Sequence, residues 1–395
     1  MFRLRYRSSV LSVVVLVGTA WLAPASRAAD NSWIGQKVIL KHEGVKIGHT
    51  GPDGRPIYVA DLTDIAYTVL KEEDGWLQVR QGGAADWFAK DSALLVDDAI
   101  TYFDERLRIN SRDALAYAHR GRAWRELGEL ERALRDFDDA LALSPLRFGW
   151  LRIRGAFYEE KHAAWFRNRG ALYEEMKDFD KAIRDYDEAL RINPFDALTY
   201  LDRGVAWKGK KAFDKAVADY SEAIRLDPKW TDAHYNRANV YKARKEYDKA
   251  IADYSTAIRL DPKNADAYFN RASAYKARRE YAKVVGDYYE VLRLEPNDAD
   301  ALDNLAWVLA TCPDDAVRDG QKALDCASAA CELTDAKSAY FLATVAVAFA
   351  EIGKFDLAIK WQKRALESES YEREEGEKAR KRLKLFDERK PYREE

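Results

Sequence analysis

A 34-residue period constrains this sequence more than any other feature. Prolines mark the period, because they recur at the same spacing at Pro194, Pro228, Pro262 and Pro296. Between them an aromatic residue returns at one fixed offset, as Trp207, Tyr241 and Tyr275. A repeat of this length is one supersecondary unit, and such a unit buries its apolar face only by stacking on its neighbours. The sequence therefore predicts an array of stacked units, most regular between residues 197 and 298.

Each regular unit predicts two amphipathic helices. In one unit these are Ala233–Arg244 and Tyr247–Leu260, where apolar residues recur at spacings of three and four. Ala216 and Ala250 share a column, and alanine suits positions where two helices approach closely. Each proline follows a second helix and ends it, because proline cannot continue a helix. The fold class is therefore mostly α.

These columns, a small residue followed by aromatic, alanine, aromatic and proline, resemble the tetratricopeptide repeat. The resemblance implies a helical solenoid, a right-handed superhelix of antiparallel helix pairs with a concave groove that binds other chains. We expect about seven units over residues 113–372, with a capping helix at 98–112 before them. We expect residues 373–395, which are dense in both charges, to form a helix that caps the array and then frays.

The second unit breaks the period. Pro145 and Pro194 are 49 residues apart, and the extra 15 residues, in 150–179, are a duplication in which Trp150–Glu160 recurs as Trp165–Glu175. Two structures fit: one long continuous helix, or a three-helix unit bent at residues 161–164. The absence of a turn signal there favours the long helix. A second irregularity is an insertion between the helices of the sixth unit, at Thr311–Gly320.

The first 29 residues predict a secretory signal. Arg3, Arg5 and Arg7 precede the 13-residue apolar run Val10–Leu22, and small residues place cleavage near Ala25–Ala29. The run is short for a bilayer span, which needs about 20 residues, although an uncleaved anchor is the alternative. We expect a periplasmic or secreted protein with no membrane association after cleavage.

Residues 30–97 differ in character from the repeats. Glycine and proline cluster there among five runs that favour β-strands: Lys37–Leu40, Ile57–Ala60, Ala66–Leu70, Trp76–Arg80 and Asp86–Ala89. This pattern predicts a small β-barrel. The segments Asp74–Val79 and Asp86–Phe88 resemble a bacterial Src-homology-3-like domain, although Asp86 stands where the family has glycine. The resemblance implies binding of peptides or cell-wall material, with Trp76 and Trp87 on the ligand face; the favoured alternative is that both tryptophans fill the core.

Composition excludes several functional classes. The formal net charge is −2, which gives no attraction to nucleic acid. No catalytic motif and no metal-binding spacing is visible, so we expect no enzymatic activity, cofactor or metal. Only three cysteines occur, Cys312, Cys326 and Cys331, and two states fit them: one Cys312–Cys326 disulfide or, preferably, buried free thiols.

Two columns on the first helices are candidate binding residues. The first is amide-rich and consists of Asn168, Asp202, Asn236, Asn270 and Asn304. In peptide-binding members of the family that the repeats resemble, asparagine here hydrogen-bonds the backbone of an extended ligand, because the amide both donates and accepts. The alternative is that these amides satisfy neighbouring helix ends.

The second column is basic and consists of Lys208, Lys242 and Lys276, with Tyr235 and Phe269 nearer the groove. Together with Lys210, Arg244 and Arg278 it would line one edge of the array and attract an acidic segment or a C-terminal carboxylate. The favoured alternative is a solvated face paired with residues such as Asp214 and Asp248.

The sequence therefore predicts a non-enzymatic protein–protein interaction scaffold that holds partner peptides or proteins in the groove of the array. A cell-wall-associated module is the alternative. In that case the β-barrel binds peptidoglycan or peptide, and the array positions a partner enzyme.

Overall fold

The computed structural model describes residues 36–41, 46–50, 56–61, 66–73, 75–81, 84–143, 155–334 and 338–394. The predicted signal at 1–29 and the first part of the duplication, Trp150–Arg154, lie outside these residues. No helix among the described residues is both long and apolar enough to cross a membrane.

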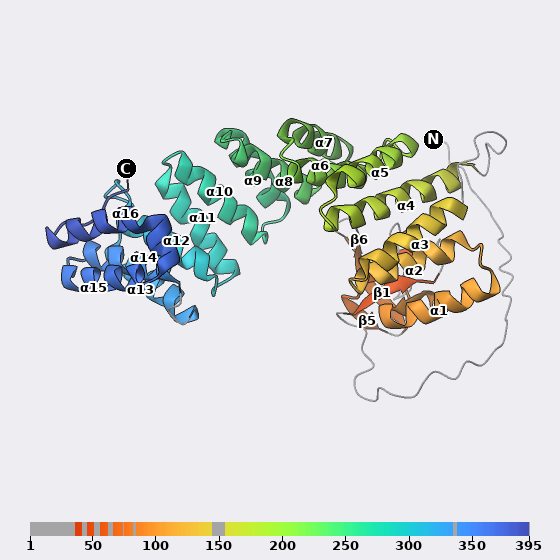
Figure 1. Ribbon diagram of the computed structural model, residues 1–395, viewed down its shortest axis with the longest axis horizontal. Coiled ribbons are helices and arrows are strands. Elements are labelled where there is room, and N and C mark those ends of the chain that lie inside the picture. The colour runs from red at the N-terminus through yellow and green to blue at the C-terminus, as the bar shows by residue number, and fades with distance from the viewer. Residues whose placement is uncertain are drawn as a thin grey trace, which may run out of the picture.

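Sixteen α-helices follow one another in the described residues and form an elongated array (Figure 1). The first eight are α1 Val96–Ile109, α2 Ala114–Glu126, α3 Leu130–Leu143, α4 Gly155–Glu175, α5 Phe179–Ile192, α6 Ala197–Gly209, α7 Phe213–Leu226 and α8 Thr231–Ala243. The remaining eight are α9 Tyr247–Leu260, α10 Ala265–Ala277, α11 Tyr281–Leu294, α12 Ala299–Thr311, α13 Gly320–Leu333, α14 Ala339–Glu351, α15 Phe355–Leu366 and α16 Glu369–Asp387. The mostly α fold predicted from the 34-residue period is confirmed.

Consecutive helices from α2 to α15 pair into seven antiparallel hairpins. Small residues permit the close approach within each pair. A Cβ on Gly204 of α6 would lie 2.6 Å from the ring of Tyr220 on α7, so only glycine fits there without displacing the ring. Tyr220 is fully buried, as are its counterparts Tyr186 and Tyr254. The repeated aromatic column thus fills the space that the small column leaves open.

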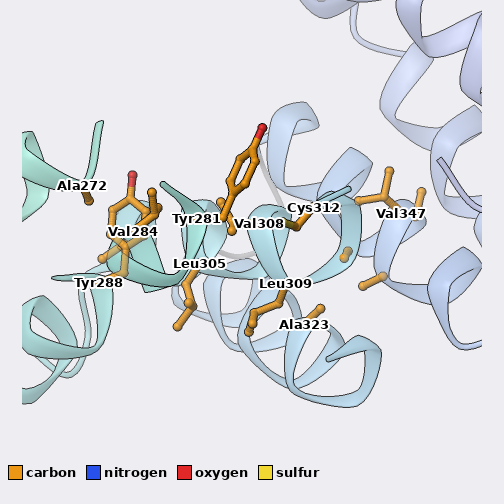
Figure 2. Close-up of a cluster of buried hydrophobic side chains, with 14 of the residues drawn as sticks. Ala272, Tyr281, Val284, Tyr288, Leu305, Val308, Leu309, Cys312, Ala323 and Val347 are labelled. Carbon is orange, nitrogen blue, oxygen red and sulfur yellow. The ribbon is translucent and has the colours of Figure 1, made fainter. Parts of the chain in front are cut away.

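The largest apolar cluster joins the last regular repeat to the sixth (Figure 2). Tyr281, Val284 and Tyr288 of α11 meet Leu305 and Leu309 of α12. Cys312 at the end of α12 is fully buried in the same cluster, and all three cysteines are free thiols. At this junction the core therefore runs continuously from one repeat to the next, as stacking of the repeats requires.

The N-terminal β domain contains two antiparallel sheets. Sheet order is β4-β1-β8 in one and β3-β2-β7-β6-β5 in the other. The strands are β1 Lys37–Leu40, β2 Lys46–Thr50, β3 Pro56–Asp61, β4 Ala66–Thr68, β5 Lys71–Glu73, β6 Trp76–Gln81, β7 Ala84–Ala89 and β8 Ala93–Leu95. The five predicted runs coincide with β1, β3, β4, β6 and β7. The short strands β2, β5 and β8 were not predicted, because their sequences are polar or only three residues long.

The prediction that Trp76 and Trp87 fill the core of this domain is wrong. The core consists of residues such as Val38, Leu77 and Phe88, and both tryptophans are only half-buried. Strand pairing explains the difference. The core residues Leu77 and Phe88 oppose each other, and each tryptophan is the neighbour of one of them along its strand: Trp76 precedes Leu77 and Trp87 precedes Phe88. Because side chains alternate along a strand, the two tryptophans share the face turned away from that core.

The β domain and the array pack directly against each other. Ile39 of β1 is fully buried among Val96, Phe103 and Ala116 of the first two helices. The ring nitrogen Nδ1 of His119 on α2 lies 2.8 Å from the carbonyl oxygen of Leu40. One face of β1 thus belongs to the β core and the other to the array. Helix α1 is the expected cap, placed between sheet and first hairpin.

Helix α4 settles the form of the duplication within the described residues. It runs unbroken for 21 residues through the region where a bend was the alternative, whereas its partner α5 has 14 residues. The long helix therefore overshoots its partner, as a duplicated first helix predicts.

The C-terminal segment differs from the expectation that it frays. Helix α16 buries Tyr371, Ala379 and Phe386 on one face despite its charged composition. After α16 the chain folds back, and Tyr392 packs against the apolar cluster of α11 and α12. Apolar residues spaced along α16 provide this anchorage, and the density of charge in the sequence obscured them.

Candidate partner-binding surface

The first helices of successive repeats form a common surface. Helix α4 contacts α6, α6 contacts α8, and α8 contacts α10. The predicted asparagine and lysine columns both lie on these helices. The surface is therefore continuous over the regular repeats, and side chains on it can interact between repeats.

The two columns, predicted separately, meet in the structure. The amine Nζ of Lys208 donates to Oδ1 of Asn236 at 3.5 Å, and Lys242 donates to Asn270 at 2.5 Å. In each pair the lysine ends the first helix of one repeat and the asparagine lies on the first helix of the next. Lysine and asparagine therefore form one mixed row, the Lys–Asn row, across repeats three to five.

The two lysines of these pairs are half-buried and have no salt bridge to a carboxylate in the described part of the chain. Desolvation by burial lowers the pKa of Lys208 and that of Lys242. The charge of Glu174 opposes this shift at Lys208. A half-buried ammonium group without a salt-bridged carboxylate carries a desolvation cost that an incoming carboxylate would offset.

Lys276, the third lysine of the row, already has a carboxylate. Its Nζ lies 3.1 Å from Oε1 of Glu394 in the C-terminal segment. The Lys276 position thus shows in this chain that a lysine of the row can pair with an acidic side chain.

The remaining predicted residues line the same helices. Asn270 donates to the Tyr235 hydroxyl at 3.0 Å and to the backbone carbonyl of Asp266 at 2.9 Å. Asn304 donates to the carbonyl of Asp300 at 2.8 Å. The Phe269 ring packs edge-on against Tyr288, with centroids 5.5 Å apart. The amide-to-backbone bonds run to a carbonyl in the first turn of the same helix, so they hold each amide against its own helix and do not reach a neighbouring helix end.

The start of the row is acidic. Asp202 occupies the asparagine position of repeat three, and Glu174 occupies the lysine position before it. Burial raises the pKa of Asp202 to about 7, with Arg167 opposing and Glu174 adding to the rise. Asn168 is only 3% exposed, so it offers little surface to a ligand. The row therefore changes sign along α6, from the carboxyl groups of Glu174 and Asp202 to the ammonium group of Lys208.

The outer basic residues do not join the Lys–Asn row. Arg244 binds Asp214 of the preceding repeat at 2.6 Å, and Arg278 and Lys210 pair with Asp248 and Asp180 in the same way. For these outer residues the favoured alternative to ligand binding was a solvated face with paired charges. Lys210, Arg244 and Arg278 lie in such a face. Sequence spacing could not separate them from Lys208 and Lys242, which are two residues away but lie on the inner helix face.

A ladder of arginine–aspartate pairs, which we did not predict from the sequence, runs along the array. In each of five repeats an arginine on the first helix binds a buried aspartate 16 residues later through Nε and Nη2, at distances of 2.6–2.9 Å. The pairs are Arg120–Asp136, Arg169–Asp185, Arg203–Asp219, Arg237–Asp253 and Arg271–Asp287. The constant spacing of 16 was the available signal. These pairs join the two helices of a repeat and leave no free charge for a ligand.

Models of known protein families match three stretches of the array. A TPR repeat model matches residues 208–244 and 238–278, and two tetratricopeptide repeat models match residues 163–196 and 95–147. These units are tetratricopeptide repeats. The matches at 208–278 lie in the regular repeats, and the match at 163–196 includes most of the elongated helix α4. The match at 95–147 begins at the capping helix α1. No curated protein matches the chain in sequence.

Solved tetratricopeptide structures resemble the array at low identity. The C-terminal part of a TPR repeat-containing protein from Cytophaga hutchinsonii is 18% identical, with a TM-score of 0.50, over 62% of this chain and 93% of that one. A tetratricopeptide repeat protein from Parabacteroides merdae is 16% identical, with a TM-score of 0.44, over 69% and 98%. YrrB, described as a TPR protein with an unusual peptide-binding site, is 20% identical, with a TM-score of 0.41, over 51% and 96%. The first of these likenesses supports the fold alone.

Proposed function

We propose that the array is a protein interaction scaffold whose Lys–Asn row binds an extended acidic segment of a partner protein. The observation that carries the proposal is that Lys208 and Lys242 are half-buried, hydrogen-bonded to amide oxygens and without a salt-bridged carboxylate among the described residues. Ligand carboxylates would form salt bridges with these two ammonium groups, and the asparagine amides would contact the ligand backbone.

The repeat spacing favours an extended ligand over a compact one. Successive lysines and asparagines present the same groups once per repeat along one continuous surface. A partner segment with several acidic residues would contact more than one repeat, and these contacts would act together. The acidic start of the row, at Glu174 and Asp202, would repel such a segment and would fix where its acidic part begins.

Binding of a labelled glutamate-rich peptide, measured by fluorescence anisotropy, tests the proposal. The double variant Lys208→Gln and Lys242→Gln should weaken binding about five- to thirtyfold, because two favourable charge contacts worth roughly 0.5–1 kcal/mol each are lost. Lys229→Gln with Lys263→Gln is the matched control, since it makes the same charge change at exposed turn positions of the same repeats. Equal losses in the two double variants would show only a general charge effect and would contradict the proposal.

The Trp76 and Trp87 face favours a second binding function for the β domain. Both tryptophans lie half-exposed on the face turned away from the core, where a ligand can contact them. We propose that this domain is Src-homology-3-like and that this face binds peptide or cell-wall material. Sedimentation of the whole chain with purified peptidoglycan should be lost in the Trp76→Ala and Trp87→Ala double variant and kept in the lysine double variant. Failure of the native chain to sediment would exclude the cell-wall ligand.

We also propose that the protein is exported, with removal of the first 25–29 residues. Export would place both binding surfaces in the periplasm or outside the cell. The mass of the protein recovered from cells checks this, since retention of Met1–Ala29 would contradict cleavage.

A further inference from the structure

We propose that the C-terminal segment Tyr392–Glu394 is a built-in occupant of the Lys276 end of the Lys–Asn row, and that an acidic partner must displace it. The part concerning the partner rests on the proposed function. The part concerning the segment itself stands on contacts within this chain. The C-terminal end of the chain lies at the α12 and α16 end of the array (Figure 1).

Glu394 contacts two repeats at once. One carboxylate oxygen lies 3.1 Å from Nζ of Lys276, and the other accepts from Nε1 of Trp307 at 3.3 Å. The backbone N–H of Glu394 donates to the carbonyl of Thr311 at 2.9 Å. The segment is therefore recognised through a charge, an indole donor and a backbone carbonyl, which are the groups that a site for an extended acidic peptide needs.

The two preceding residues complete the docking. The Tyr392 ring packs near the Trp307 ring, with centroids 6.0 Å apart, and beside the guanidinium of Arg382. Arg393 donates to Oε2 of Glu351 on α14 at 2.6 Å and to the carbonyl of Ala310 at 3.4 Å. Three consecutive side chains thus contact α10, α12, α14 and α16. A segment that merely extended from α16 would not place all three against the array.

A competing acidic segment can replace Tyr392–Glu394 at this site. The segment follows the end of α16 at Asp387 and forms neither helix nor strand of its own. The Lys276 and Glu394 side chains are 31% and 27% exposed, so water screens their attraction and a competing carboxylate can reach the amine. The segment holds its position largely because it is tethered, which gives it a high effective concentration at the site.

Lys276 is the third member of the column to which Lys208 and Lys242 belong. A partner whose acidic side chains pair with all three lysines must compete with Glu394 for Lys276. The segment would then restrict the resting chain to partners that bind two lysines, and its release would extend the site to Lys276 and Trp307. Occupancy of the site by the chain's own end is an autoinhibitory contact.

The first test uses the segment as its own probe. A labelled peptide of residues 390–395 should bind a chain shortened to end at Lys390 and should bind the intact chain at least tenfold more weakly. Lys276→Gln in the shortened chain should weaken that binding about fivefold. Equal binding to both chains, or no binding to a shortened chain with native circular dichroism, would overturn the proposal. This readout involves no external partner and is therefore independent of the proposed function.

The second test keeps the chain at full length. Glu394→Gln removes the charge that faces Lys276, and Glu388→Gln is the control, because Glu388 pairs with Lys390 at the surface. The affinity for a glutamate-rich peptide should rise about fivefold in the first variant and stay unchanged in the second. An unchanged affinity in both variants would overturn autoinhibition. If no variant binds the glutamate-rich peptide while the residue 390–395 peptide binds the shortened chain, the proposed function fails and the docking site stands.

Discussion

Asp202 illustrates how one residue can change the behaviour of a repeated column. It stands where Asn236 and Asn270 stand in the next two repeats, and burial raises its pKa to about 7. A carboxyl group whose pKa is higher in the folded than in the unfolded state binds more protons when folded between the two values. Its contribution to stability is therefore present at low pH and is lost as the pH rises from about 4 through about 7.

We expect Asp202→Asn to flatten this pH dependence. Native stability should fall by on the order of 1–2 kcal/mol between pH 5 and pH 8, after allowance for solvent screening, and the variant should lose most of that slope. Urea unfolding at a series of pH values measures the effect. The exposed residue Asp232 provides the control, because Asp232→Asn should leave the slope unchanged. A slope that is the same in native protein and Asp202→Asn would contradict the assignment.

Lys245 is a second residue whose backbone matters more than its charge. It lies two residues after the end of α8 and has a φ of 61°, a left-handed conformation that glycine adopts readily and lysine does not. Lys177, Lys211 and Arg279 occupy the same position in other repeats, whereas the first and last hairpins have Gly128 and Gly353.

Lys245→Gly should therefore stabilise the protein by about 0.5–1 kcal/mol, because glycine removes the strain of the left-handed conformation. Chemical denaturation measures the change. Ala252→Gly, at an exposed site in the middle of α9, is the matched comparison and should destabilise by about 1 kcal/mol. The opposite signs of the two glycine substitutions are the expected result.

At the scale of helices, the arginine–aspartate ladder holds each hairpin together. Arg237 on α8 binds Asp253 on α9 with two nitrogens, at 2.7 and 2.8 Å, and also donates to the Ser221 hydroxyl of the preceding repeat at 2.9 Å. Asp253 is only 7% exposed. The arginine therefore compensates a buried carboxylate and links two repeats at the same time.

Arg237→Ala should destabilise the array by about 3 kcal/mol, because it leaves the buried Asp253 carboxylate with only the His234 ring, whose Nδ1 is 3.7 Å away. Guanidinium unfolding followed by circular dichroism measures the loss. Arg259→Ala, at an exposed site on α9, should change stability by no more than about 0.5 kcal/mol. Similar losses in both variants would show that the ladder contributes only surface charge.

At the scale of the whole molecule, β1 couples the two structural parts. One side of this strand faces the β core through Val38 and Leu40, and Ile39 on the other side packs against α1 and α2. The His119 contact to the Leu40 carbonyl joins the same elements. The packing of Ile39 should accordingly stabilise α1 and α2 as well as β1.

Ile39→Ala should cost about 2–5 kcal/mol locally and should uncouple the β domain from α1, because it creates a cavity in their shared cluster. Hydrogen exchange measured by mass spectrometry should then rise in α1 and α2 as well as in β1. Val79→Ala removes a residue buried only in the β core, so exchange should rise in β6 and β7 while α1 stays protected. Equal protection of α1 in the two variants would contradict the coupling.

Much of the fold follows from local signals in the sequence. Helix pairs were predicted correctly because amphipathic spacing, alanine columns and the proline after each second helix act within one 34-residue unit. The continuous form of α4 followed from the lack of a turn signal between the two copies. The columns of Asn236, Asn270, Lys208 and Lys242 were found from the 34-residue period, because equivalent positions of a repeated unit lie on the same side of the array.

The tertiary structure decided which of these residues act together. Lys208 meets Asn236 of the next repeat, whereas Lys210 pairs outward with Asp180, and only the stacking of helices separates the two lysines. Trp76 and Trp87 face away from the core because the pairing of β6 with β7 fixes which side chains share a face. Trp307 and Glu394 are 87 positions apart, and no periodicity connects them. The sequence by itself determined the repeating unit, since its signals are local; the sign and occupancy of the binding surface depend on contacts between distant segments, which only the folded chain brings together.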